Sequence, residues 1–283
     1  VPSAVEFIAA LGTLLRDRTL ETAFAAEAIV LPSEEYLGNQ MTMVDVDAIH
    51  EAREALKKEV AARLTDSLLE VYHENRVNTP YDPNPQDAAR RKLKNGVLGY
   101  LMSQPNPEML TLGVEQFEGA DNMTDMIAAL ACLKDIEGTE RVSAFAAFYD
   151  RWRDDPLVLD KWFSLQAMSS LPDTLSAVEE LLGHPAFSMR NPNKVRALIG
   201  AFCAGNQLRF HSPDGTGYEF VASRVLELDA LNPQVAARLL APLGQWRRFD
   251  TSRQDLMRGE LERVLAKTAL SRDVYEVASK SLG

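Results

Sequence analysis

The sequence is poor in residues that favour β-strands. Only 7% of its 283 residues are aromatic, while alanine and leucine are abundant, and this balance favours helix over sheet. Runs that alternate between apolar and polar residues are absent, and the valines are spread through patterns with helical spacing. We therefore expect an all-α fold.

Cysteines and long apolar runs are also scarce. Cys132 and Cys203 stand in apolar segments without a metal-ligating neighbour at short spacing, as expected for small buried side chains in a reducing compartment. No apolar run reaches the roughly 20 residues that cross a bilayer, and the first residues lack the pattern of a secretory leader. These features predict a cytoplasmic location and no membrane contact.

The charge is negative and unevenly distributed. A net charge of −11 repels phosphate backbones, so we expect no nucleic-acid partner. Residues 191–283 nevertheless hold 13 Lys and Arg against 10 Asp and Glu, whereas residues 1–190 hold 17 against 31. The C-terminal third could meet an anion or dock on an acidic surface, and unevenly charged solvated faces are the alternative.

Helical periodicity dominates the chain. Residues 46–76 form one long amphipathic pattern. Further on, helix starts are signalled at Thr124, Thr139, Pro156, Asp173 and Pro192, and then at Gly217, Asn232, Thr251 and Ser271. A pair of helices thus recurs about every 32 to 36 residues, which is typical of stacked helical hairpins. The pattern predicts an irregular α-solenoid, a HEAT- or armadillo-like superhelix.

The segment RFHSPDGTGYEF (209–220) gathers polar side chains around two glycines. It partly matches a calcium loop, but no glutamate stands at the twelfth position that such a loop requires. Pro213, Asp214 and Gly215 form a strong turn signal, because proline presets its backbone angle and glycine tolerates a positive φ. We interpret the segment as an ordered connection between two helices.

Recognisable catalytic motifs are absent. Glu74 follows His73, but Val77 stands where the second histidine of an H-E-x-x-H zinc motif would be. The chain also has no G-x-S-x-G, no phosphate-binding loop and no C-x-x-C. We therefore predict neither a catalytic residue nor a metal site in this chain, and interpret its four histidines as structural or surface residues.

Two segments open alike, NPNKVRALIGAF (191–202) and NPQVAARLLAPL (232–243). Asparagine is a good N-cap and proline suits the first helical position. Each segment then places one arginine in a largely apolar run, Arg196 and Arg238. Such a guanidinium must reach solvent, a carboxylate or a ligand. A buried ion pair, an arginine that extends to water and a ligand contact all remain open.

These two segments, LVLDKWFSLQA (157–167) and DNMTD (121–125) resemble the C-terminal domain of bacterial aminopeptidase N, the alanyl aminopeptidases among the gluzincin zinc peptidases. Similar stretches run from LPSEEYL (31–37) to DVYEVASKSL (273–282). The resemblance therefore covers nearly the whole chain.

The resemblance implies a zinc-dependent parent enzyme that removes N-terminal amino acids from peptides. Family members carry G-A-M-E-N and H-E-x-x-H motifs in a catalytic domain, and neither motif occurs here. The resemblance thus implies zinc in the parent enzyme, none bound by this chain, and no activity of the chain alone. The domain would cap the active-site cavity of the catalytic domain and admit short peptides. The family's substrate-binding arginines correspond to Arg196 and Arg238.

We accordingly expect residues 1–283 to form a single α-solenoid domain of a larger aminopeptidase, and the start at Val1 favours this view. The alternative is a free-standing helical-repeat scaffold that binds a protein partner on its concave face. An H-E-x-x-H motif encoded upstream would exclude the scaffold.

Overall fold

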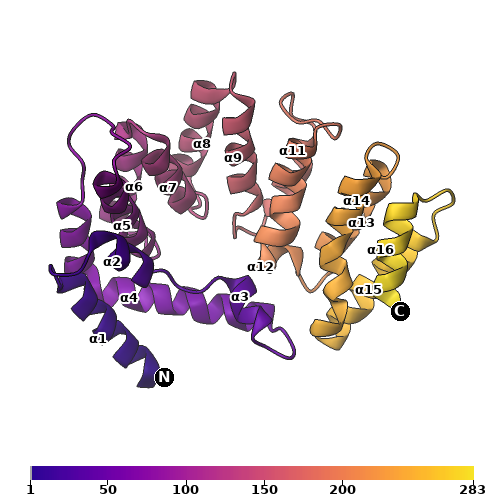
Figure 1. The fold of residues 1–283 in the computed structure, drawn as a ribbon, viewed down its shortest axis with the longest axis horizontal. Coiled ribbons are helices and arrows are strands. Elements are labelled where there is room, and N and C mark those ends of the chain that lie inside the picture. Colours follow the sequence, from indigo (N-terminus) through magenta and orange to yellow (C-terminus); the bar gives the residue numbers. More distant parts are fainter. Residues whose placement is uncertain (1) are drawn as a thin grey trace. The chain divides into compact units, whose positions relative to one another are not determined.

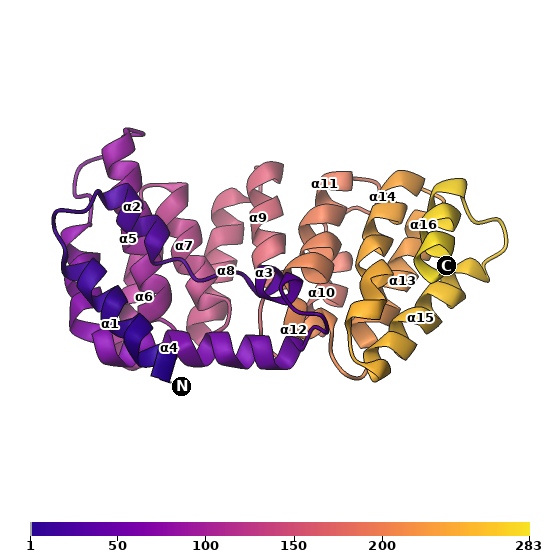
Figure 2. The same ribbon diagram turned by 60° about the horizontal axis from the view of Figure 1, so that its bottom comes forward.

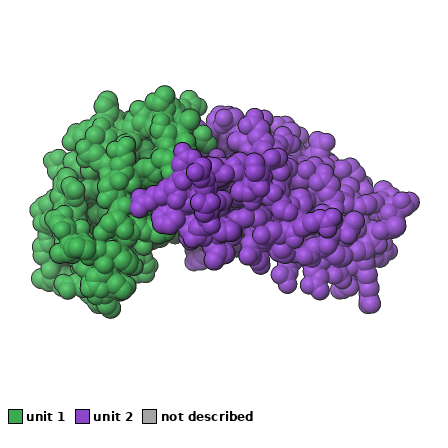
Figure 3. Space-filling model, turned by 90° about the horizontal axis from the view of Figure 1, so that it is seen from above, with its two compact units in different colours: residues 1–32, 51–147 green, residues 33–50, 148–283 purple. Residues whose placement is uncertain are grey.

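A computed structural model describes residues 2–283, and every regular element in this range is helical. The predicted all-α fold is confirmed. The chain divides into two compact units: residues 1–32 and 51–147 form unit 1, and residues 33–50 and 148–283 form unit 2 (Figure 3). A single domain over residues 1–283 stays a prediction.

The helices follow one another with short connections (Figure 1). Those of unit 1 are α1 (Pro2–Arg16), α2 (Thr22–Ala28), α5 (Pro85–Leu101), α6 (Pro107–Gly119) and α7 (Met123–Leu133). Those of unit 2 are α3 (Glu34–Asn39), α9 (Pro156–Ala167), α10 (Thr174–Leu182), α11 (Pro192–Val195), η1 (Arg196–Gly205), α12 (Gln207–Phe210), α13 (Thr216–Leu228), α14 (Pro233–Leu240), η2 (Ala241–Arg248), α15 (Thr251–Leu265) and α16 (Arg272–Leu282). Helices α4 (Val46–Glu74) and α8 (Thr139–Trp152) have residues in both units.

Asparagine caps explain where many of these helices begin. The side chains that accept a backbone hydrogen bond at a helix start belong to Asn84, Asn106, Asn122, Asn191, Asn206 and Asn232. Proline follows the cap at the first position of α5, α6, α11 and α14. Each such cap stabilises a helix by about 0.5–2 kcal/mol. Because these signals are local, the predicted helix starts between residues 124 and 271 differ from the observed starts by at most one residue.

Unit 1 is built around a fully buried apolar core. Its inaccessible side chains include Leu68 of α4, Val97 and Leu98 of α5, and Leu130 and Leu133 of α7. The long helix predicted for residues 46–76 is present as α4, but its backbone leaves helical geometry at Leu64, with φ −118° and ψ 16°. The periodic sequence pattern continues across this bend and therefore did not reveal it.

A buried polar network crosses the core of unit 1. Asp125 pairs with Nζ of Lys94 at 2.8 Å and accepts the amide of Asn95 at 2.8 Å. Gln116 donates to Asn95 at 2.8 Å and accepts the hydroxyl of Tyr72 at 2.9 Å. The network thus gives the DNMTD segment a structural role, because Asp125 connects α7 to α5 and, through Gln116, to α6 and α4.

Unit 2 consists of two packed layers of helices. Helices α9, η1, α14 and α16 lie side by side in one layer (Figures 1 and 2). Helices α10, α12, α13 and α15 pack against it. Phe163, Leu198, Phe202, Val225 and Leu240 are fully buried between the layers. This stacking is the α-solenoid arrangement that the sequence predicts.

Residues 33–50 belong to unit 2 although they precede the rest of it by about a hundred residues. Arg248 donates to Gly38 O and Asn39 Oδ1, each at 2.8 Å, and its own carbonyl accepts the Val44 amide at 2.7 Å. Arg253 pairs with Asp47 at 2.6 Å. Two arginines therefore hold this early segment against the end of η2 and the start of α15.

Candidate functional site

Arg196 stands where α11 passes into η1. Asn191 caps α11 through the Asn193 amide at 2.9 Å, and from Arg196 to Gly205 the helix widens to π geometry. The Arg196 side chain is exposed, and within residues 2–283 its single hydrogen-bond partner is Asn193 Oδ1. π segments are rare and occur frequently at functional sites. Neither the neighbouring residues nor their spacing signalled this widening.

Arg238 lies near the middle of α14. Asn232 caps the helix by accepting the Val235 amide at 3.2 Å, while Ala236 and Leu239 turn into the core. The side chain of Arg238 is exposed, and no residue of the described range 2–283 forms an ion pair or hydrogen bond with it. Its guanidinium donors are therefore available to a ligand or to water.

The structure brings the two arginines onto neighbouring helices of one layer. A Cβ atom at Gly200 would lie 3.8 Å from Cβ of Arg196 and 4.0 Å from Cδ2 of Leu239. Leu239 follows Arg238 directly, so Gly200 marks where the two arginine-bearing helices meet. The buried Arg–carboxylate pair, one of the open alternatives, is not formed by either residue. Contact with water or with a ligand remains.

A buried lysine fixes the start of α11 against α9. Lys194 is 5% exposed and its Nζ lies 2.7 Å from Asp160 Oδ1 and 2.5 Å from Pro156 O. Ser164 adds a hydrogen bond to Ala197 O at 2.9 Å. Because Lys194 precedes Arg196 by two residues, these contacts hold the backbone that carries the exposed guanidinium.

The 209–220 segment has a structural role in unit 2. His211 is 3% exposed, stacks on Phe249 at 4.3 Å, and its Nδ1 lies 2.9 Å from the Tyr218 hydroxyl. Burial, with the charge of Arg253 as a second cause, lowers the pKa of His211 to about 3. The imidazole is therefore neutral at pH 7 and serves as a core side chain.

The turn within this segment is equally tied to the backbone. Asp214 Oδ1 accepts the amide of Thr216 at 3.0 Å and its hydroxyl at 2.8 Å, and these hydrogen bonds lower the pKa of Asp214. A Cβ at Gly217 would lie 2.2 Å from the carbonyl oxygen of Phe210. The polar residues thus stabilise the connection, in agreement with the interpretation from the sequence.

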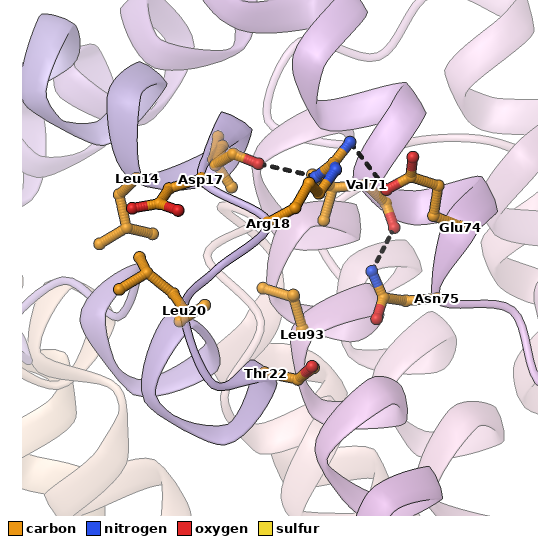
Figure 4. Close-up of a pocket in the computed structure, with 11 residues that line it drawn as sticks. Leu14, Asp17, Arg18, Leu20, Thr22, Val71, Glu74, Asn75 and Leu93 are labelled. Atoms are coloured by element: carbon orange, nitrogen blue, oxygen red, sulfur yellow. Dashed lines mark hydrogen bonds and ion pairs between the residues drawn. The ribbon is translucent and has the colours of Figure 1, made fainter.

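A pocket of about 210 Å³ lies in unit 1, between the end of α1 and helices α2, α4 and α5 (Figure 4). Leu20 and Leu93 line its apolar part. On its rim Arg18 pairs with Glu74 at 2.7 Å and donates to Leu15 O at 3.0 Å. The rim arginine is therefore neutralised by its neighbours. The sequence gave no sign of this pocket, because its lining comes from separate helices.

The described residues do not form a metal centre. Among residues 2–283, no three His, Cys, Asp or Glu side chains are grouped so that they could hold a metal ion, so the chain does not fit a zinc site. In the same range, no helix has the length and apolar character needed to cross a bilayer.

Helical hairpins stacked over a continuous core define a helical-repeat protein. The chain belongs to the family described as a domain of unknown function with ARM repeats (DUF3458_C), whose model matches residues 2–283. This match confirms the predicted solenoid class.

Similar proteins are aminopeptidases. Aminopeptidase N of Caulobacter vibrioides is 42% identical over 274 residues, which cover 97% of this chain and 32% of the relative. Aminopeptidase N of Escherichia coli is 39% identical over 273 residues, covering 96% and 31%. The structure of Legionella pneumophila aminopeptidase A in complex with aspartic acid matches with a TM-score of 0.89 and 32% identity, over 98% of this chain and 33% of that one.

The chain therefore spans about a third of the length of the relatives it matches. The resemblance to the C-terminal domain of bacterial aminopeptidase N is confirmed.

Proposed function

We propose that this chain is the C-terminal domain of a zinc-dependent aminopeptidase, where it caps the active-site cavity and controls the access of short peptides. Its similarity to about a third of two aminopeptidases N supports this assignment. The described residues fit no zinc site. Zinc and the residues that hydrolyse the peptide bond would then belong to a catalytic domain of the same polypeptide, and no hydrolytic step is assigned to this chain.

Arg196 and Arg238 would bind the C-terminal carboxylate of the peptide. The observation that carries this proposal is that both guanidinium groups are exposed and lack a carboxylate partner on neighbouring helices of one layer. A peptide whose amine lies at a catalytic zinc ion directs its carboxylate away from the metal. Arginine forks match carboxylates in geometry and charge, and charge-assisted hydrogen bonds are among the strongest that proteins form.

The proposed compartment is the cytoplasm. Cys132 and Cys203 are both free, and burial raises the pKa of the Cys132 thiol to about 11. Such cysteines are unreactive small apolar side chains, as expected where the surroundings are reducing.

Kinetics of the full-length enzyme test the proposal. Arg196→Ala and Arg238→Ala should each raise KM for a tripeptide about ten-fold, since each removes a charged hydrogen bond. An alanine-linked chromogenic substrate has no terminal carboxylate, so its KM should change much less. An equal change for both substrates would contradict carboxylate binding.

A mixing assay tests the cap role separately. It compares this chain alone, the catalytic part alone and the two together, on the chromogenic substrate and on a tripeptide. We expect the chain to be inert alone and to restore or reshape the activity of the catalytic part. Failure of the two parts to associate would favour the free-standing scaffold instead.

A further inference from the structure

A third exposed cation lies on the layer that carries the two arginines. Lys161 is on α9, the neighbour of η1, and its side chain is exposed. Within residues 2–283 it forms no ion pair or hydrogen bond. We call Lys161, Arg196 and Arg238 the cationic row. The three residues stand on three consecutive helices of one layer, α9, α11–η1 and α14.

The packing of α9 fixes the direction in which Lys161 points. Trp162 and Phe163, the next two residues, are 7% and 0% exposed. Asp160, the preceding residue, faces α11 and pairs with Lys194. Because successive helical residues are turned by about 100°, Lys161 is directed to the exposed face of the layer.

The carboxylate beside Lys161 is already in use. Asp160 neutralises Lys194, which is only 6% exposed at its side chain and lies 2.7 Å from Oδ1. The buried lysine thus takes the adjacent carboxylate, and the exposed lysine keeps its positive charge. The LVLDKWFSLQA segment therefore separates two lysine-contacting roles: Asp160 holds the neighbouring helix, and Lys161 faces the solvent.

The spacing of the helices sets the distance between charges along the row. Packed helices lie about 8–10 Å apart, and an extended peptide advances about 3.3–3.6 Å per residue. Adjacent positions of the row therefore correspond to about three peptide residues. A peptide whose terminal carboxylate lies on the arginines reaches Lys161 with a side chain about three residues before its C-terminus.

We propose that Lys161 is a further substrate-binding residue, which attracts an acidic side chain of the peptide and so favours acidic peptides among those admitted. This inference rests on the proposed function of Arg196 and Arg238. Lysine suits the role because its ammonium is a point charge on a flexible stem, which accepts carboxylates at several angles.

The test uses the full-length enzyme and pentapeptides of alanine in which Glu or Gln occupies the second, third or fourth position. For each position, kcat/KM of the Glu peptide is divided by that of the Gln peptide. We expect Lys161→Met to lower this ratio about two- to five-fold at one position, through KM, as for an exposed ion pair. Lys161→Arg should keep the ratio.

Lys58→Met provides a matched control, because Lys58 is also exposed and unpartnered within residues 2–283 but lies on α4, outside the row. It should leave the ratio unchanged. An unchanged ratio for Lys161→Met at all three positions would overturn the inference. If Arg196→Ala and Arg238→Ala still raise KM for the tripeptide, only the role of Lys161 fails. If they do not, the proposed function fails with it.

Discussion

Charged residues serve opposite ends in the two units. In unit 1, Asp125 and Lys94 are 8% and 5% exposed, and their charges are met by partners within the core. In unit 2, Arg196 and Arg238 are exposed and no carboxylate meets them. Buried charges with complete partners hold helices together, whereas exposed charges without partners are available to bind a ligand.

The same contrast appears between two arginines of unit 2. The Arg253 side chain is 10% exposed and donates to Asp47, Asp250 and the His211 carbonyl. Arg238 is exposed and has no such partner among residues 2–283. An arginine therefore reveals its role through its partners and its burial, and the residue type alone does not distinguish the two.

The largest effect is expected for the unit 1 network. Asp125→Ala leaves Lys94 buried without its counter-charge, and this should lower the free energy of unfolding by about 3–5 kcal/mol. Urea unfolding measures the loss. Asp121→Ala, which removes an exposed carboxylate four residues earlier, should cost less than about 0.5 kcal/mol. Equal effects of the two changes would show that the buried network does not hold unit 1 together.

A somewhat smaller effect is expected for Arg253→Ala. The change removes two ion pairs and leaves the buried His211 carbonyl without its side-chain donor, and should cost about 2–3 kcal/mol. Hydrogen exchange should also show faster exchange in residues 33–50, which lose their anchor. Arg258→Ala, which removes only exposed pairs, is the control. Unchanged exchange in that segment would contradict the anchoring role.

Acid should destabilise the protein through His211. Its pKa is about 3 in the fold and about 6.5 in an unfolded chain. The unfolded state therefore binds the proton first, and stability is lost as the pH falls below about 6.5. This one group should lower the free energy of unfolding by about 1.4 kcal/mol per pH unit between about pH 6.5 and pH 3.

Urea unfolding at pH 7, 6 and 5 measures that slope. His211→Gln has no titrating side chain, so its stability should fall by about one proton's worth less per pH unit over this range. Identical slopes for the variant and the parent chain would show that His211 is not held neutral by the fold.

The smallest effect on stability is expected for the row itself. Arg196→Ala and Arg238→Ala should each change the free energy of unfolding by less than about 0.5 kcal/mol, because exposed side chains without partners contribute little. A loss above about 2 kcal/mol would place these arginines with Arg253 as structural residues.

The sequence predicted what local chemistry determines. Asparagine caps followed by proline placed the start of α11 and α14 to within one residue, since a cap needs only its own helix turn. The apolar spacing of residues 46–76 likewise predicted α4. The two arginines of the candidate site were found in the same way, because each interrupts a largely apolar helical run.

Features that depend on distant residues were not predictable. The contact of Arg253 with Asp47 joins residues 206 positions apart, and no local pattern encodes such a pair. The π widening from Arg196 to Gly205 keeps an ordinary helical composition. Whether Arg196 and Arg238 would be buried in ion pairs or exposed also depended on which helices flank them, so the sequence left both possibilities open.

Amidated peptides test the central claim most directly. The measurement is KM of the full-length enzyme for trialanine and for trialanine amide, with the wild type and the Arg196→Ala/Arg238→Ala double variant. If the arginines bind the terminal carboxylate, amidation should raise KM about ten-fold in the wild type and little in the double variant. An equal effect of amidation in both enzymes would show that the carboxylate is bound elsewhere.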